Sequence, residues 1–242
     1  MTDNVIIIPS RLEAKRLPNK PLKKINNKEM ILHVYEVAKK ANVGDVIVAS
    51  PNKEIYDLIS SVNGTCIITK PTHKTGTDRI FEVFDKILNK KPQLIINLQG
   101  DMPNLDPKEI IFLCNHLKKG LCDIATLAAP LKEDEVNDRN VVKVFTKETM
   151  KKSSFTVAAD FNRDITANRN DFAYHHIGIY GFTNNVLIKY VNLKRSKLEL
   201  ERDLEQMRAL ENRMNIHVGL VNSTPLSVDT EKDLKDIQEL MK

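Results

Sequence analysis

Short apolar segments and helix-length amphipathic segments alternate through the first part of the chain. The apolar segments are rich in β-branched residues, are bounded by turn residues, and cover 5–9, 45–50, 65–69 and 94–98. Between them, apolar residues recur at helical spacing in 30–41, 54–62 and 78–88. Strands buried on both faces are continuously apolar, and strands that alternate with helices form parallel sheets. The pattern predicts an α/β fold with a mostly parallel sheet and helices on both faces.

The second half is less regular. It predicts strands at 122–131, 140–146, 153–161 and 173–182, followed by one helix at 198–214. In that helix a single apolar stripe is expected from Leu200, Leu204, Met207 and Met214. With no internal repeat and no low-complexity linker, the chain is predicted to be one domain to which the second half adds a smaller lobe of strands and helix.

Composition excludes several classes of protein. The chain has 242 residues, of which 41% are apolar, enough for a sizeable core. A net charge of +5 and 5% aromatic residues argue against nucleic-acid binding. No apolar run reaches the roughly 20 residues of a membrane span. The three cysteines form no disulfide framework and no signal-peptide pattern is present, which together favour the reducing cytoplasm. Cys114, His116 and Cys122 are interpreted as ordinary packing residues because a fourth ligand and paired spacing are missing.

A strongly basic segment follows the first predicted strand. Residues 11–24 carry one acid, Glu13, and six cations, which are Arg11, Lys15, Arg16, Lys20, Lys23 and Lys24. No glycine-rich phosphate-binding motif accompanies them. The segment is therefore either a solvated turn or a cationic clamp for phosphate. Pro18 and Pro21 restrict the backbone around Lys20 and lower the entropy cost of presenting its ammonium group.

Two acidic features complete the pattern. Asp101 follows the strand at 94–98, and Asp229 precedes the predicted last helix. Asp101 is either a plain turn residue or a ligand for Mg²⁺. Asp229 or Thr230 is expected to cap the last helix, with Asp233 in its first turns. Mg²⁺ usually takes one or two carboxylates with phosphate and water, so Asp101 and Asp229 together would suffice.

Six motifs in order along nearly the whole chain carry a family resemblance. They are IIIPSR with RLPNKPL, PTHKTGTDRI, NLQGDMP, HIGIYGF, LEQMR and SVDTEKDL, from residue 6 to residue 234. In this combination the chain resembles the 3-deoxy-manno-octulosonate cytidylyltransferases, or CMP-Kdo synthetases. The resemblance implies a Rossmann-like nucleotidyltransferase, usually a homodimer, that joins CTP and Kdo with Mg²⁺ to give CMP-Kdo and pyrophosphate for lipopolysaccharide assembly.

The resemblance also assigns parts of the chain. It implies a nucleotide-binding part at about 1–130, a sugar-binding and dimerisation lobe at about 131–215, and a metal-site strand and helix at about 216–242. Arg11, Lys20, Asp101 and Asp229 match catalytic positions, the two aspartates as metal ligands. The implied nucleotide-binding residues are Arg11, Arg16, Lys20, Thr75, Gly76, Thr77, Arg79 and Gln99.

Sugar recognition is implied by four further motif matches. Gln99 belongs to the Gln-Gly-Asp motif, Arg163 follows an aromatic strand residue, His176 and Tyr180 lie in HIGIYGF, and Glu205 and Gln206 form the helical Glu-Gln pair. Arg163 is expected to bind the Kdo carboxylate, because a guanidinium matches carboxylate geometry. Without the family, His176 reads as a packed strand residue and Gln206 as a helix-surface amide.

Three departures from the family pattern leave alternatives open. Asn19 stands where a glycine is usual, Met102 where many members have Glu, and residues 162–167 lack the usual Ser and Pro. Asn19 is expected to adopt the left-handed turn that the glycine would adopt. The alternatives are a cytidylyltransferase for another acidic sugar, such as 8-amino-Kdo or sialic acid, and a non-catalytic nucleotide-binding relative.

Overall fold

The computed structural model describes residues 3–14, 16–86, 91–168, 171–222 and 224–242. The chain divides into two compact units, one of Met1–Ile111 with Pro225–Lys242 and one of Phe112–Thr224. Among the residues described, none of the helices combines the length and the apolar character needed to cross a bilayer.

The first unit contains a parallel sheet with strand order β5-β4-β1-β6. Its strands are β1 (Asn4–Pro9), β4 (Asp45–Ser50), β5 (Thr65–Ile68) and β6 (Leu94–Leu98). β1 lies between its neighbours, with Ile7 opposite Ile47 of β4 and Asn97 of β6. Every residue of β1 and β6 is buried, as the continuous apolar runs predicted.

Crossover helices connect these parallel strands. They are α1 (Met30–Ala41), α2 (Lys53–Ser61) and α3 (Gly76–Lys86). Crossovers are right-handed, and the strand order reverses direction between β5 and β6, so α3 covers the face opposite to α1 and α2. α1 has its predicted bounds, whereas α3 begins two residues early, where Thr75 Oγ1 accepts a hydrogen bond from the Asp78 N–H. Residues 87–88 of that prediction lie outside the described residues.

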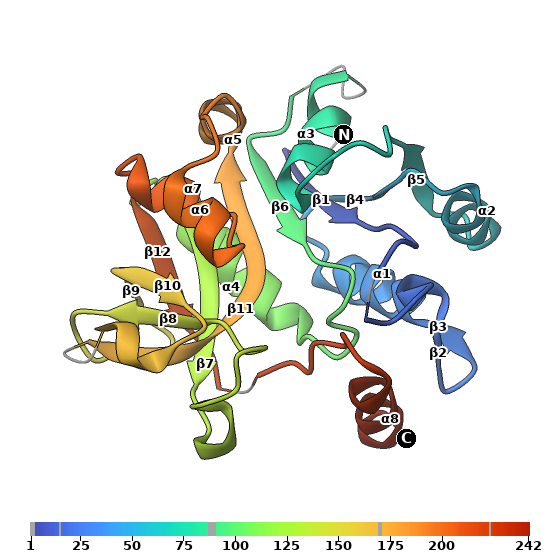
Figure 1. Cartoon of the computed structure of the whole chain (residues 1–242). Helices are drawn as coiled ribbons and strands as arrows, with labels where there is room; N and C mark the ends of the chain where they lie inside the picture. The colour runs from blue at the N-terminus through green and yellow to red at the C-terminus, as the bar shows by residue number, and fades with distance from the viewer. Residues whose placement is uncertain (1–2, 15, 87–90, 169–170, 223) are drawn as a thin grey trace. The chain divides into compact units, whose positions relative to one another are not determined.

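The carboxyl-terminal residues return to the first unit. α8 (Glu231–Leu240) lies beside the hairpin of β2 (Lys24–Ile25) and β3 (Lys28–Glu29), as Figure 1 shows. Gln238 Nε2 donates to the Lys24 carbonyl at 2.7 Å, and Asn26 Nδ2 donates to the Met241 carbonyl at 2.8 Å. As predicted, Thr230 caps α8, and its side chain accepts a hydrogen bond from the Asp233 N–H.

The second unit is built on a mixed sheet. β7 (Ile124–Pro130) pairs antiparallel with β11 (Phe172–Thr183) and parallel with β12 (Ile216–Leu220). β9 (Phe155–Val157) joins β12, while β8 (Lys143–Thr146) joins β11 and β10 (Asp160–Asn162). The described residues of this unit also form the helical segments η2 (Glu133–Glu135), η3 (Ile165–Asn168), α5 (Asn184–Val191), α6 (Lys197–Arg202) and α7 (Met207–Glu211), and α4 (Pro107–Leu117) ends in this unit. The predicted α/β class is confirmed.

Two predicted elements are each divided into two in the structure, so their prediction as single elements is wrong. The strand expected at 153–161 is two strands, β9 and β10, that pair with different neighbours. The helix expected at 198–214 is divided into α6 and α7, because Asp203 adopts the left-handed conformation (φ 52°) that ends α6. Leu200 is consequently 58% exposed and lies outside the predicted stripe, although Leu204, Met207 and Met214 are buried.

A buried ion pair holds these two short helices together. The Glu199 carboxylate, with no exposed surface, accepts from Arg208 Nε at 2.8 Å and from Arg208 Nη2 at 2.6 Å. Arg195 Nε donates to the same carboxylate at 2.8 Å. Burial alone would raise the pKa of Glu199, but the hydrogen bonds and charges of the two arginines lower it below its ordinary value.

Glu199→Gln is expected to lower the free energy of unfolding at pH 7 by about 3 kcal/mol, because it removes the negative charge from the buried group that accepts two hydrogen bonds from the Arg208 guanidinium. A carboxylate with a lowered folded-state pKa stabilises the fold above its unfolded pKa and loses that effect as the pH falls through the folded value. The difference between variant and wild type should therefore shrink below about pH 4. Urea unfolding at several pH values measures it, and Glu201→Gln, at a 53% exposed side chain, is the control. Equal effects of the two variants would contradict the expectation.

Candidate functional site

The ammonium group of Lys20 lies between two carboxylates. Its Nζ is 3.1 Å from Oδ2 of Asp101 and 2.9 Å from Oδ1 of Asp229. Lys20 follows β1, Asp101 follows β6 and Asp229 precedes α8, so three separate segments of the first unit meet here. Burial alone would lower the pKa of Lys20, but the charges of the two aspartates and their hydrogen bonds raise it. Lys20 is therefore a cation at neutral pH, and the two aspartates form the pair that the sequence indicated.

The backbone before Lys20 makes a left-handed turn. Asn19 has φ 56° and ψ 29°, which confirms the expectation that asparagine adopts here the conformation usual for glycine. The Asn19 N–H donates to the Leu12 carbonyl at 3.2 Å, and the Lys20 N–H donates to the Leu17 carbonyl at 3.1 Å. The turn leads into η1 (Lys20–Leu22). At the first residue of η1, the Lys20 side chain points toward the two aspartates.

The basic segment is also fastened where it leaves β1. Asn52, at the N-cap of α2, accepts from the Leu12 N–H at 3.1 Å and donates to Glu13 Oε1 at 3.2 Å. A backbone hydrogen bond of Glu13 and this contact with Asn52 lower the pKa of the Glu13 carboxyl. Among the other cations of the segment, Lys24 is 63% exposed, Lys23 pairs with Glu231 at 3.0 Å, and Lys15 lies outside the described residues. The segment is held at both ends and is not a freely solvated turn.

Leu17 anchors the basic segment to the part of the chain that carries Asp229. Its side chain has no exposed surface and belongs to an apolar cluster. The other buried members are Ile25, Met30, Val228, Leu234 and Ile237. Val228 is adjacent to Asp229, so this cluster fixes the distance between Lys20 and its second carboxylate. Sequence reasoning missed Leu17, although a leucine enclosed by cations, prolines and asparagine was the available signal.

Leu17→Ala is expected to lower the free energy of unfolding by about 2–5 kcal/mol, because the change leaves a cavity among well-packed side chains. It should also weaken binding of a phosphate ligand, since the cluster positions both Lys20 and Asp229. Thermal unfolding and titration with CTP measure the two effects. The matched control is Leu240→Ala on α8, where the side chain is 64% exposed. A variant as stable as this control would contradict the role of Leu17.

Backbone contacts join the two aspartate segments directly. The Val228 N–H donates to the Asp101 carbonyl at 2.9 Å, and the Leu226 N–H donates to Asn104 Oδ1 at 3.0 Å. Asp101 and Asp229 thus stay together through main-chain geometry. Met102, next to Asp101, is only 3% exposed, so its side chain points into the interior.

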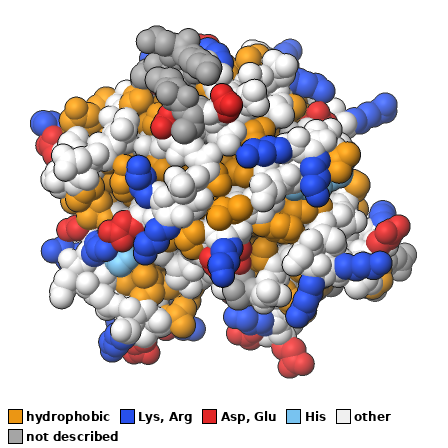
Figure 2. Space-filling model, turned by 180° about the vertical axis from the view of Figure 1, so that it is seen from behind, with side chains coloured by type: hydrophobic (Ala, Val, Ile, Leu, Met, Phe, Trp, Pro, Cys, Tyr) orange, Lys and Arg blue, Asp and Glu red, His pale blue; other side chains and the backbone are white. Residues whose placement is uncertain are grey.

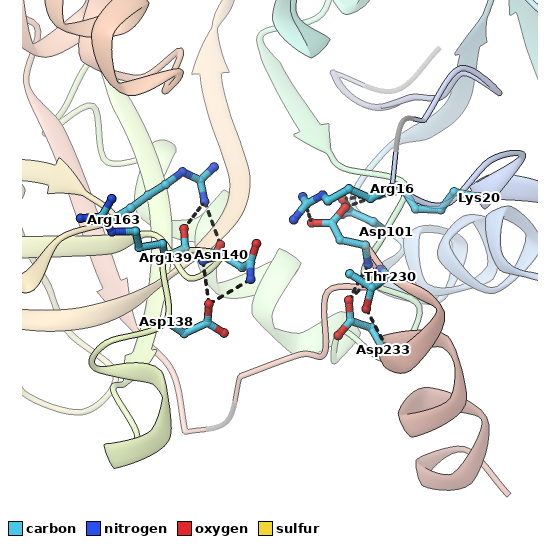
Figure 3. A network of polar contacts seen from close by, with 10 residues as sticks. Arg16, Lys20, Asp101, Asp138, Arg139, Asn140, Arg163, Thr230 and Asp233 are labelled. Carbon is cyan, nitrogen blue, oxygen red and sulfur yellow. Dashed lines mark hydrogen bonds and ion pairs between the residues drawn. The ribbon is translucent and has the colours of Figure 1, made fainter.

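Two arginines extend the positive charge. Arg16 Nη2 is 2.9 Å from Asp229 Oδ2, and Figure 3 shows Arg16 and Lys20 directed toward the carboxylate side of Asp101. The Arg16 side chain is 51% exposed, so this ion pair contributes little free energy. Arg11 is exposed just beyond β1, and its charge contributes to the lowered pKa of Arg79, after the larger effect of burial.

The segment at 75–79 forms the start of α3 and touches the Gln-Gly-Asp loop. Asn97 Nδ2 donates to Thr77 Oγ1 at 3.2 Å, and Gln99 Nε2 donates to Asn97 Oδ1 at 2.9 Å. A Cβ atom at Gly76 would lie 3.0 Å from Gln99 Nε2, so only glycine leaves this amide in place. Thr77 is 1% exposed, and its hydroxyl holds the Asn97 side chain in place. The Gln99 side chain lies beside Gly76.

Arg79 has a structural position. It is 3% exposed, and its Nη1 donates to Thr69 Oγ1 at 2.6 Å and to the Lys70 carbonyl at 3.1 Å. These bonds tie α3 to the segment that follows β5. Its implied contact with nucleotide stays a prediction.

The implied sugar residues belong to the second unit, apart from Gln99. Arg163 Nη1 donates to the carbonyls of Asn140 at 2.8 Å and Arg139 at 3.1 Å, as Figure 3 shows. Lys143, with no exposed surface, donates from Nζ to the Asp138 and Arg163 carbonyls at 2.6 and 3.0 Å. Burial lowers the pKa of Lys143. Sequence reasoning missed this lysine, which was visible as a lone cation in the apolar segment NVVKVFT.

His176 is a buried residue of β11. Thr126 Oγ1 lies 2.7 Å from the Ile179 carbonyl and 2.9 Å from His176 Nε2. Because the hydroxyl has one proton and gives it to the carbonyl, His176 Nε2–H donates to the hydroxyl oxygen, which leaves Nδ1 as the acceptor. Burial lowers the pKa of His176 to about 3, so the imidazole is neutral at pH 7. The ring packs edge-on against Phe161 with centroids 5.0 Å apart.

Tyr180, Glu205 and Gln206 also belong to the second unit. The Tyr180 ring is 5.5 Å from the His176 ring, and burial raises the pKa of its hydroxyl. The Glu205 carbonyl accepts from the Tyr190 hydroxyl at 2.7 Å. Gln206 is 5% exposed and stands at the N-cap of α7. The expectation of a helix-surface amide is therefore wrong, as is the expectation that this pair lies inside a helix.

The two aspartates of the first unit fit a divalent cation. Their oxygens approach one positive centre, the Lys20 ammonium, and carboxylate oxygens are the ligands that Mg²⁺ prefers. Asp233 has a different use, because its Oδ2 accepts from the backbone N–H groups of Asp229 and Thr230 at 3.0 and 2.8 Å.

Comparison with known proteins matches the cytidylyltransferase family to residues 5–216. A 3-deoxy-manno-octulosonate cytidylyltransferase of Bartonella henselae is 41% identical over 239 residues, 98% of each chain. One from Rickettsia felis is 39% identical over 234 residues, 96% of this chain and 93% of the relative.

The solved structures include a similar protein. It is a CMP:2-keto-3-deoxy-manno-octonic acid synthetase complexed with CTP, 34% identical, with a TM-score of 0.87 and 98% of each chain covered. Sequence and structure agree over almost the full length. The chain belongs to the 3-deoxy-manno-octulosonate cytidylyltransferase family of nucleotidyltransferases.

Proposed function

We propose that the protein transfers CMP from CTP to the anomeric hydroxyl of Kdo, with Mg²⁺, and releases pyrophosphate. The observation that carries this proposal is the Lys20 ammonium held between Asp101 and Asp229. A nucleoside triphosphate needs a cation for its phosphate charge, and its metal ion needs carboxylate ligands; this site offers both. The names and the CTP complex of the relatives support the choice of substrates.

In this reaction the sugar hydroxyl oxygen forms a bond to the α-phosphorus of CTP, and the bond from that phosphorus to the pyrophosphate oxygen breaks. Negative charge spreads over the phosphoryl oxygens and the leaving group, so positioned cations supply most of the catalysis. Lys20 is the central cation, with Arg11 and Arg16 on the exposed side of the segment. Asp101 and Asp229 would hold Mg²⁺, which neutralises phosphate charge and lowers the pKa of the attacking hydroxyl.

Each remaining residue has a proposed binding role. Gln99, presented beside Gly76, and the start of α3 at Thr75 and Thr77 contact the nucleotide, together with Arg79. In the second unit, Arg163 is proposed to bind the sugar carboxylate and His176 a sugar hydroxyl, through its acceptor Nδ1. Gln99, Tyr180, Glu205 and Gln206 complete the proposed set for the sugar. The three-part division at about 130 and 215, the homodimer, the cytoplasmic location and the role in lipopolysaccharide assembly are proposed from the family resemblance.

Nucleic-acid binding has less support. The face in Figure 2 carries Lys and Arg side chains scattered among acidic and apolar ones, without a continuous basic band. Electrostatic recognition of a phosphate backbone needs clustered cations.

A pyrophosphate-release assay tests the proposal. CTP is combined in turn with Kdo, 8-amino-Kdo and N-acetylneuraminate, each with and without Mg²⁺. The expected result is metal-dependent release with Kdo. Release with only another acidic sugar would replace the substrate, and CTP binding without release under any condition would favour the non-catalytic relative.

A further inference from the structure

Three side chains able to bind a transition metal meet within the second unit. His116 lies in the last turn of α4, Cys122 in the segment before β7, and His217 on β12. One nitrogen of each histidine and the Cys122 sulfur all lie within 4.8 Å of one another. His116 Nε2 is 2.9 Å from His217 Nδ1. Three elements separated by up to 101 positions thus bring two imidazoles and a thiol together.

The backbone around this His-Cys-His cluster is fixed. The N–H groups of Asp123 and Ile124 donate to the Asn215 carbonyl at 3.0 and 3.1 Å, and the Asn215 N–H donates to Asp123 Oδ2 at 2.7 Å. These bonds join the segment that carries Cys122 to the strand that carries His217. A metal ion at this place would not have to gather its ligands from a flexible chain.

The His116 ring is also held in place. It stacks on Phe155 of β9 with ring centroids 3.6 Å apart and an interplanar angle of 6°. Gly219 makes this packing possible, because a Cβ atom there would lie 2.6 Å from Phe155 Cζ. His116 is 7% exposed, and Cys122 and His217 are partly exposed, so the cluster has a packed side and an open side.

The donor atoms suit zinc better than magnesium. Imidazole nitrogen and thiolate sulfur are preferred by Zn²⁺ and neighbouring transition metals, whereas Mg²⁺ takes oxygen. A hydrogen bond joins His116 Nε2 and His217 Nδ1, so one of these two nitrogens is an unprotonated acceptor with a lone pair to offer. The backbone N–H of His217 hydrogen-bonds the Cys122 sulfur, a contact that favours thiolate, although burial raises the pKa of the thiol to about 11.

The spacing is close to that of a tetrahedral site. Zinc bonds of about 2.0–2.1 Å to nitrogen and about 2.3 Å to sulfur place adjacent ligand atoms roughly 3.3–3.6 Å apart. The 2.9 Å between the two ring nitrogens must open by about 0.4 Å, and the wider separations must close by up to about 1.2 Å, within the reach of side-chain rotation. Asn215 Nδ2 lies 3.2 Å from His217 Nε2. When Nδ1 of His217 binds a metal, Nε2 carries the ring proton, and the Asn215 amide oxygen would accept that proton once the amide group turns by 180°.

We propose that His116, Cys122 and His217 form a binding site for a divalent transition metal of the zinc type, with a fourth position open to water. Binding breaks the hydrogen bond between the two imidazoles and forms two metal–nitrogen bonds and one metal–sulfur bond. The proton of that hydrogen bond moves to the other nitrogen of its ring, and the thiol proton is released to solvent. The ion ties α4, the Cys122 segment and β12 together, so it stabilises the second unit. The proposal is independent of the function proposed for the aspartate pair.

Cobalt(II) is the probe, because a thiolate ligand gives it a charge-transfer absorption that oxygen ligands do not give. Tag-free protein titrated with Co²⁺ should develop this absorption at one equivalent, and Zn²⁺ should remove it and raise the melting temperature. Cys122→Ser should abolish the absorption, and His217→Gln should weaken Co²⁺ affinity at least about 100-fold, since loss of a group that merely orients a ligand already costs 10–100-fold. Cys114→Ala, at a buried cysteine outside the cluster, and Asp101→Asn are the controls that should keep it.

A second measurement uses only the wild-type chain. Zn²⁺ should protect Cys122 from alkylation by a maleimide, with the modified residue identified by mass spectrometry. Mg²⁺ at the same concentration should give no protection. An absent cobalt–thiolate absorption, or one that persists in Cys122→Ser, would overturn the proposal, and so would equal alkylation with and without Zn²⁺.

Discussion

An Asp101→Asn protein should fold like the wild type and release pyrophosphate about 10²–10³-fold more slowly, the loss seen when one group that stabilises transition-state charge is removed. Asparagine has nearly the shape of aspartate but no charge to hold a divalent cation beside the triphosphate. Asp101 is one of two carboxylates at the Lys20 ammonium, 3.1 Å from its Nζ, so Asp229 alone would remain.

The matched control for this variant is Asp106→Asn. Asp106 is exposed on the segment after Asp101, and its Oδ1 accepts from the Lys108 N–H at 2.9 Å, a role that an asparagine oxygen can also perform. Steady-state rates at several Mg²⁺ concentrations, with melting curves to show folding, measure both proteins. A folded Asp101→Asn protein with the wild-type rate and wild-type Mg²⁺ dependence would remove Asp101 from the catalytic site.

Lys20→Met is expected to change metal binding and nucleotide binding in opposite directions. Without nucleotide, the Lys20 ammonium neutralises both aspartates and competes with a metal ion for them. Its removal should strengthen binding of Mn²⁺, used as a probe, about tenfold, which corresponds to about 1.4 kcal/mol. CTP should bind more weakly, and turnover should fall at least about 100-fold, because the phosphate loses its central cation.

Mn²⁺ titration followed by electron paramagnetic resonance, with and without CTP, separates these two effects. Lys23→Met is the matched control, because Lys23 is in the same segment and pairs with Glu231, outside the aspartate pair. If Lys20→Met loses affinity for Mn²⁺ and CTP in parallel, the lysine supports the carboxylates and does not compete with the metal.

The first half of the fold was predictable because its central strands β1, β4 and β6 are almost completely buried, although the edge strand β5 is partly exposed. Continuous apolar runs gave β4 and β6 at their observed bounds, and the helical spacing of apolar residues did the same for α1. The second half resisted prediction because its turns depend on single residues in unusual conformations. Asp203, with φ 52°, ends α6 inside a segment that has helical periodicity throughout. Nothing in that periodicity signals the change.

In the candidate site, the charged residues were predictable from the sequence, whereas the residues that act through packing were not. Order of motifs was enough to pair Lys20 with Asp101 and Asp229. It was not enough to find Leu17, whose importance comes from Val228 and α8, more than 200 positions away. The motif also did not indicate that Arg79 donates hydrogen bonds to Thr69 and to the Lys70 carbonyl inside the unit. The meeting of His116, Cys122 and His217 likewise depends on strand pairing that no local spacing reveals.

The central claim is that this chain joins CTP to Kdo at the phosphorus next to the ribose. Phosphorus nuclear magnetic resonance of one reaction mixture, containing the protein, CTP, Kdo and Mg²⁺, tests it most directly. The account predicts that the three CTP signals are replaced by one phosphodiester signal of CMP-Kdo and by pyrophosphate in equal molar amounts. Unchanged CTP, or conversion to CDP and phosphate, or to free CMP without a sugar phosphodiester, would contradict it.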